Sequence, residues 1–196
     1  METFLKLLEY IDYNLDNNYF IFLLFLFIFM LVYNSFSLPG NIILMASTGY
    51  FFGLIIGYII SILALTLGSL IFFMFFSNVI KNYFPENHSR YLQKINNYTN
   101  KNSLEYILIL RIIPGTPLFL QNLFLASLKI KKSIFFFMSL IGFTPIVFLV
   151  VFFGKQLNNL AKFSSFKLAD ILSVEYFIFL ILVFLILFIR IIFKKK

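Results

Sequence analysis

One long uncharged stretch restricts the fold more than any other feature of this chain. Between Asp16 and Lys81, the 64 residues 17–80 contain no Asp, Glu, Lys or Arg. A soluble domain carries charge on roughly a quarter of its residues, whereas here only 12% are charged and 61% are hydrophobic. Uncharged segments of this length are needed in a lipid bilayer. The sequence therefore predicts an integral membrane protein and excludes a water-soluble fold.

Proline and glycine divide this stretch into segments of unequal length. Residues 19–33 are apolar and predict a first transmembrane helix. Pro39 and Gly40 then interrupt the helix, because proline lacks a backbone donor and restricts the residue before it. Residues 42–52 are too few to cross a bilayer at about 1.5 Å per residue, so they predict a re-entrant segment. Residues 54–77 predict a second transmembrane helix.

The second half of the chain repeats this order, with the two Pro-Gly pairs 75 residues apart. A broken apolar segment, 106–128, precedes a third predicted transmembrane helix at 133–153, and a fourth follows at 174–193. The predicted structural breaks are Pro39, Gly40, Pro114, Gly115, Pro117, Gly142 and Pro145. Because one crossing separates the copies, the short segments enter from opposite faces, as in an inverted repeat. The expected fold is all-α, with about four transmembrane helices and two opposed re-entrant helical hairpins.

The regions outside this repeat are more polar. Residues 1–18 predict an amphipathic helix at the membrane interface. Residues 19–155 form the predicted membrane domain, with its core at 36–155. Residues 156–196 comprise the end of a polar loop that begins at 154, the last transmembrane helix and a basic tail.

Lysine and arginine predict the orientation in the membrane. One side would hold Lys6, the four basic residues of loop 78–103, the lysines of 129–132 and the basic tail. The other side would hold only Lys155, Lys162 and Lys167. Because cytoplasmic loops carry an excess of Lys and Arg, both termini are expected in the cytoplasm. We expect a multi-pass protein of the cell membrane, and favour a bacterial inner membrane.

Arg111 is the most informative single residue, because it lies within an apolar segment. A charge at membrane depth costs about 2.5–3.5 kcal/mol on insertion scales, and such charges usually have a function. Arg111 could therefore bind an anion or act as a gate. The alternatives are that its side chain snorkels to the interface or pairs structurally with a carbonyl.

Three amides accompany Arg111 at the two breaks: Asn41, Gln121 and Asn122. They could bind lipid headgroups or water, or satisfy backbone groups that the breaks set free. We predict that Arg111, Asn41, Asn122 and Gln121 bind substrate. With no cysteine and one histidine, the chain predicts no metal site, and it shows no cofactor or enzyme motif. The basic residues flank apolar segments rather than forming one soluble face, which argues against nucleic acid.

Several motifs occur in a fixed order: Leu38-Pro39-Gly40, Gly49, Gly53, Gly57, Gly68, Leu110-Arg111-Ile112-Ile113-Pro114-Gly115-Thr116-Pro117, Asn122, Gly142-Phe143-Thr144-Pro145 and Gly154. In this combination, residues 36–155 resemble the VTT-domain superfamily, the DedA-like and SNARE-associated membrane proteins. Asn41 replaces the acid that is typical of the DedA branch, and Pro117 stands where a second Arg could be. The chain therefore resembles the branch with the vacuolar and Golgi-associated relatives more closely.

The resemblance implies opposed re-entrant hairpins that meet in mid-membrane, and transport or scrambling of phospholipids or polyprenyl-phosphate carriers. Arg111 would then lie near the path of the phosphate. The expected partners are membrane lipids, with self-association left open. Two other functions remain: a non-transporting scaffold or assembly factor, and a transporter of small ions or metabolites.

Overall fold

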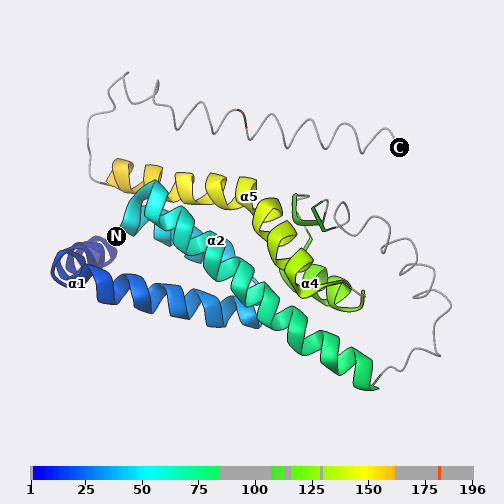
Figure 1. Ribbon diagram of the computed structural model, residues 1–196. Helices are drawn as coiled ribbons and strands as arrows, with labels where there is room; N and C mark the ends of the chain where they lie inside the picture. Colours follow the sequence, from blue (N-terminus) through cyan, green and yellow to red (C-terminus); the bar gives the residue numbers. More distant parts are fainter. Residues whose placement is uncertain are drawn as a thin grey trace.

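The computed structural model describes residues 2–83, 107–108, 110–112, 116–128, 130–161 and 181. Within these ranges the chain is helical and contains no strand. Its principal elements are α1 (Glu2–Ser35), α2 (Asn41–Tyr83), α4 (Leu118–Ala126) and α5 (Lys132–Ala161) (Figure 1). The predicted helix 174–193, apart from Ile181, and two predicted breaks, Pro114 and Gly115, lie outside the described residues.

Three described helices are long and apolar enough to cross a membrane: Asn18–Ser35, Asn41–Ile80 and Lys132–Asn159. Large apolar side chains also remain exposed along α1: Phe20, Ile21, Leu24, Phe25, Ile28, Phe29 and Val32. Exposed apolar surface of this extent needs an apolar environment. The all-helical fold and these spans agree with the prediction of an integral membrane protein.

α1 consists of two helices that meet at Asn18, whose backbone is non-helical (φ −132°, ψ 34°). The kink coincides with the predicted boundary between the segments 1–18 and 19–33. Beyond it, the apolar helix runs to Ser35, and the connection to α2 passes through Pro39 and Gly40, where the helix is interrupted as predicted.

α2 reverses direction at Gly53, where φ is +74° and ψ is −174°. Its two parts, 41–52 and 54–83, then pack closely, because a Cβ atom at Gly57 would lie 2.7 Å from the carbonyl oxygen of Thr48. The hydroxyl of Thr48 lies 2.7 Å from that of Ser61 and donates to the Gly57 carbonyl at 3.1 Å. Residues 41–61 therefore form a helical hairpin, with the short segment where the sequence placed it.

The second half contains a similar short helix and long helix. α4 begins directly after Pro117 and ends at a turn that leads into α5. α5 continues through Gly142 and Pro145, so the prediction that these two residues break the chain is wrong. Pro145 removes only one backbone donor, and a single lost bond bends a helix without ending it; Figure 1 shows this bend.

α5 also continues to Ala161, past the predicted end of its transmembrane segment at Phe153. The predicted loop at 154–161 is therefore helical, because these residues pack on the first hairpin. The side-chain amide of Asn158 donates to the carbonyl of Tyr50 at 2.6 Å. A Cβ atom at Gly154 would lie only 1.9 Å from the carbonyl oxygen of Ala46, which shows how closely the two helices approach.

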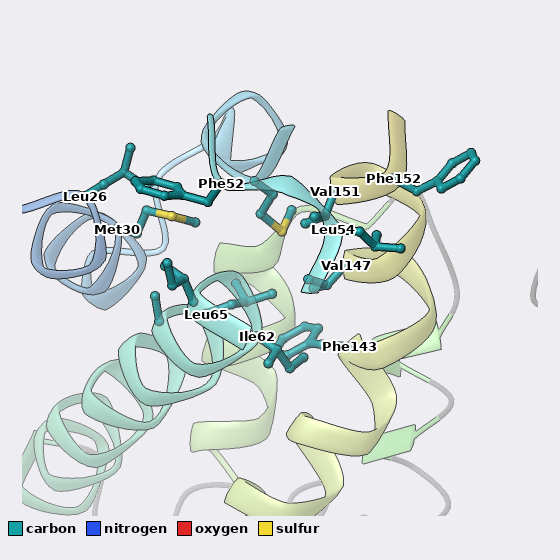
Figure 2. Packing of buried hydrophobic residues seen from close by; sticks show 13 residues of the cluster. Leu26, Met30, Phe52, Leu54, Ile62, Leu65, Phe143, Val147, Val151 and Phe152 are labelled. Atoms are coloured by element: carbon teal, nitrogen blue, oxygen red, sulfur yellow. The ribbon is translucent and has the colours of Figure 1, made fainter. Parts of the chain in front are cut away.

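Each short helix packs against the long helix of the other half. The first hairpin and α1 share a core with the C-terminal half of α5, where Leu26 and Met30 lie near Phe52 (Figure 2). The same core includes Leu54, Val147 and Val151. α4 packs against the C-terminal part of α2 and the start of α5, in a second core of Phe73, Ile107, Leu125, Ala126, Leu128 and Phe135. The two halves are thus interlocked, and the short helices lie at opposite ends of α5.

Candidate functional site

Arg111 is almost completely buried, with only 2% of its surface exposed. The position is fixed by Gly142 of α5, where an added Cβ atom would lie 2.5 Å from the Arg111 Cβ. Gly142 is therefore where the arginine side chain packs on α5. The snorkelling alternative does not fit this geometry, because the side chain does not reach the surface.

The guanidinium group donates three hydrogen bonds to side-chain oxygens. Nε donates to Ser139 Oγ at 3.3 Å, Nη1 to Gln121 Oε1 at 3.1 Å and Nη2 to Asn122 Oδ1 at 2.6 Å. Two predicted site residues, Gln121 and Asn122, are thus in direct contact with the third, Arg111. All three acceptors are neutral.

Two aromatic rings complete the surroundings of the guanidinium. Its Cζ atom lies 5.2 Å from the ring centroid of Phe135 and 4.4 Å from that of Phe143, within the range of cation–π attraction. Together with Ser139 and Gly142, these residues occupy one face of α5, at the spacing i, i+4, i+7 and i+8 that helical periodicity puts side by side. The spacing shows that Ser139 shares a face with Gly142 and Phe143, but not that this face meets Arg111.

The helices around Arg111 provide no negative charge. The sequences of α2, α4 and α5 contain neither Asp nor Glu. Neutral oxygens and aromatic faces solvate the guanidinium but leave its net charge in place. Three of its five N–H groups have acceptors among the described residues. The site is therefore a buried cation to which these three helices supply no counter-ion.

Asn122 connects this cation to the first half of the molecule. Its Oδ1 accepts from Arg111, while its Nδ2 donates to Ser37 Oγ at 2.7 Å and to Ser69 Oγ at 3.3 Å. Ser37 lies in the connection between α1 and α2, so the first interrupted region meets α4 at this amide. Asn122 binds no backbone group in these contacts, and the interpretation that it only satisfies broken backbone does not describe it.

Gln121 has a mixed role. While Oε1 accepts from Arg111, its Nε2 donates to the carbonyl of Thr116 at 3.2 Å and to the Thr116 hydroxyl at 2.7 Å. The bond to the Thr116 carbonyl satisfies a backbone group of the interrupted region, as the structural interpretation of the amides predicted. Gln121 thus ties the arginine to the chain just before α4.

Asn41 does not contact Arg111 in this structure. It is half-buried, and its Nδ2 donates a long bond of 3.5 Å to Asn34 Oδ1. Asn34 is joined to the cluster through the Ser37 backbone, whose N–H donates to the Asn34 carbonyl at 2.9 Å. Sequence reasoning missed Asn34, Ser37, Ser69 and Ser139 as members of this cluster.

Both short helices start near this cluster: Ser37, four residues ahead of α2, accepts from Asn122 of α4, and Gln121 of the first turn of α4 donates to Thr116 just ahead of that helix. α4 has no side-chain cap at its N-terminus, so its first amides lack partners within the helix. Helix N-termini carry partial positive charge and favour anions. Arg111 and two helix starts therefore define the class: a helical membrane protein with a central cationic polar cluster between two interlocked halves.

Comparison with known proteins identifies the family. The VTT domain family matches residues 38–156, and the chain belongs to this family. A transmembrane protein 41 homolog of Dictyostelium discoideum is 31% identical over 163 residues, which cover 81% of this chain and 48% of that protein. The residues matched by the VTT domain, 38–156, are nearly those for which the sequence predicted the resemblance, 36–155.

Two further relatives are more distant. A transmembrane protein 41 homolog of Caenorhabditis elegans is 25% identical over 76% of this chain and 62% of its own length. An uncharacterized membrane protein of Arabidopsis thaliana is 29% identical over 78% of this chain and 53% of its own length. The chain thus spans about half to three-fifths of these relatives. All three are eukaryotic membrane proteins, which supports a multi-pass membrane protein but not the expected bacterial inner membrane. No solved structure matches the chain.

Proposed function

We propose that this protein moves phospholipid-type molecules between the two faces of a membrane, without covalent chemistry, and that Arg111 receives the lipid phosphate. One observation carries the proposal: a buried guanidinium lies where the two halves meet, and the helices around it contain no carboxylate. A cation kept at membrane depth at this cost favours an anion as its partner. The phosphate of a membrane lipid is the anion most available there.

The chemistry of the cluster suits a phosphate. A guanidinium presents a planar fork of N–H groups that can bind two phosphate oxygens at once. Gln121 and Asn122 now hold two of its nitrogens through neutral oxygens. A phosphate could replace these weaker acceptors, and the amide N–H groups could then turn to the other phosphate oxygens. In this proposal the present structure is the closed state without lipid.

The experiment is phospholipid redistribution in proteoliposomes. Wild type should equilibrate a labelled phospholipid between leaflets. Arg111→Lys keeps the charge but loses the fork, and we expect about a tenfold slower rate, equivalent to about 1.4 kcal/mol. Arg111→Gln removes the charge and should be slower still. The control is Ile141→Ala, at an exposed position of α5 next to Gly142, on which Arg111 packs.

The outcomes separate the candidate functions. Equal rates for wild type and both Arg111 variants, at matched folded amounts, would remove the arginine from transport. No lipid redistribution by wild type would contradict the proposal and favour a scaffold. Flux of small ions in place of lipid would favour an ion or metabolite transporter.

We further propose that the hairpin 41–61 and α4 are re-entrant, and that both termini and residues 78–103, which begin in the last turns of α2, face the cytoplasm. Their packing at opposite ends of α5 supports entry from opposite faces, and the distribution of Lys and Arg supports the orientation. Reporter fusions after Lys81 and Lys196 should report the cytoplasm, and a fusion near Lys162 the opposite side. The reverse pattern would contradict this topology.

A further inference from the structure

Asn34 occupies, in the first half, the place that Arg111 occupies in the second. Each lies in a helical stretch a few residues ahead of a Pro-Gly pair, and each is buried. Each also packs its Cβ against a glycine midway along the following long helix. A Cβ atom at Gly68 would lie 2.6 Å from the Asn34 Cβ, and one at Gly142 would lie 2.5 Å from the Arg111 Cβ. The internal repeat therefore presents one charged and one neutral side chain at equivalent positions.

A continuous chain of hydrogen bonds joins these two residues, reaching Asn34 at its backbone carbonyl. Arg111 donates to Asn122 at 2.6 Å, and Asn122 donates to the Ser37 hydroxyl at 2.7 Å. The backbone N–H of Ser37 donates to the Asn34 carbonyl at 2.9 Å, and Asn41 donates to Asn34 Oδ1 at 3.5 Å. The only formal charge in this chain of contacts is at Arg111.

The middle of this chain is buried, whereas both ends approach the surface. Arg111, Asn122, Ser37 and Asn34 are buried. Asn41 is half-buried and follows the exposed Gly40, and at the other end Gln121 is bonded to the exposed Thr116. Polar groups thus lead from one interrupted region through the interior to the other.

We propose that Asn34, Ser37 and Asn41 form a second, uncharged subsite for the lipid phosphate, to which Arg111 passes the headgroup. This inference rests on the proposed function. Hydrogen bonds to a charged donor are roughly twice as strong as neutral ones, so an arginine alone would tend to retain a phosphate. Passage through a membrane protein requires several sites, each strong enough to accept the substrate and weak enough to release it.

The geometry of Asn41 suits a release position. Its 3.5 Å bond is at the outer limit of hydrogen bonding, so little is lost when the amide turns towards a ligand. It is also the first residue of α2, where the partial positive charge of the helix start favours an anion. Neutral amide and hydroxyl donors at this place offer bonds without holding the headgroup by charge.

The test compares two headgroups in proteoliposomes of the full chain: phosphatidylglycerol, which has a net negative charge, and phosphatidylcholine, which is zwitterionic. Asn34→Asp keeps shape and Cβ, loses the 2.8 Å bond from Nδ2 to the Met30 carbonyl as Asn34→Leu also does, and alone adds negative charge. The ratio of the phosphatidylglycerol rate to the phosphatidylcholine rate should therefore fall about fivefold. Asn34→Leu, of similar size, should slow both lipids and leave the ratio unchanged. Thr66→Val, at a buried hydroxyl of α2 that has no hydrogen-bond partner among the described residues, should leave both rates unchanged.

A second variant guards against the case in which Asn34→Asp fails to fold. Asn41→Asp changes a half-buried residue at a helix start, where an acid is tolerated, and it should lower the same ratio. If wild type is active and neither Asp variant changes the ratio, the second subsite is wrong while the proposed function stands. If wild type redistributes neither lipid, the proposed function fails and the subsite fails with it.

Discussion

The contacts of Arg111 have both a structural and a functional consequence. Its hydrogen bonds to Ser139, Gln121 and Asn122 tie α4 and α5 together, so the residue contributes to the fold. A structural role alone would be served equally well by a buried ion pair or by apolar side chains. The helices around it supply only neutral acceptors, and we interpret this arrangement as a site for an external anion.

Gly142 provides a prediction at the residue scale. Gly142→Ala would place a Cβ atom 2.5 Å from the Arg111 Cβ, closer than such atoms approach. Arg111 or α5 must then shift, and we expect about 1–3 kcal/mol of destabilisation from overpacking, together with slower lipid redistribution. Thermal unfolding in detergent and the proteoliposome rate measure both effects, with Ile141→Ala as control. A fully active and equally stable Gly142→Ala variant would show that Arg111 does not depend on this contact.

The sequence identified Arg111, Gln121 and Asn122 because a charge and two amides are conspicuous in an apolar segment. It missed Ser37, Ser69 and Ser139 for a physical reason. Ser69 and Ser139 lie in apolar helices, where a serine can bond its own backbone, and Ser37 lies in a turn, so their presence alone does not indicate an interhelical contact. Their roles depend on which helix faces pair, and that is a tertiary property.

At the scale of helices, length and backbone chemistry allowed correct predictions where they left few alternatives. Eleven residues cannot cross a bilayer, so the short segment 42–52 and a break before residue 54 could be inferred, and the reversal lies at Gly53. The predictions at Pro145 and Phe153 failed, because packing on neighbouring helices decides whether a bent or polar segment stays helical. Contacts such as that between Asn158 and Tyr50 are not visible in composition.

Gly53 provides a prediction at this scale. With φ +74° and ψ −174°, it adopts a conformation that is essentially restricted to glycine. Gly53→Ala should therefore destabilise the protein by about 1–3 kcal/mol, although a Cβ atom there would meet no neighbour. Thermal unfolding in detergent checks this, with Ile55→Ala, an exposed change two residues later, as control. Unchanged stability of Gly53→Ala would mean that the reversal does not need this backbone conformation.

At the scale of the whole molecule, the chain forms two similar halves that exchange their short helices. The repeat was predictable from the order of breaks and apolar segments. The exchange was not, because it depends on close approaches such as that of Gly154 to Ala46, which involve residues distant in sequence. It brings α4 against the first interrupted region through the Ser37–Asn122 bond and so places the cationic cluster between the halves.

The central claim is that the positive charge of Arg111 is left for an anionic headgroup. Asn122→Asp tests it most directly, because the new carboxylate would replace an oxygen 2.6 Å from Arg111 Nη2. The Ser37 and Ser69 hydroxyls can rotate to donate to this carboxylate, so the hydrogen-bonded cluster can persist. Asn159→Asp, the same change at an exposed position near the end of α5, is the control.

The measurement is lipid redistribution by Asn122→Asp in proteoliposomes, paired with its thermal stability. We predict stability equal to or above that of wild type, because the buried cation gains a counter-ion. Transport should be at least about tenfold slower, because a fixed carboxylate competes with the phosphate for the guanidinium. An Asn122→Asp protein that is stable and redistributes lipid at the wild-type rate would contradict the claim.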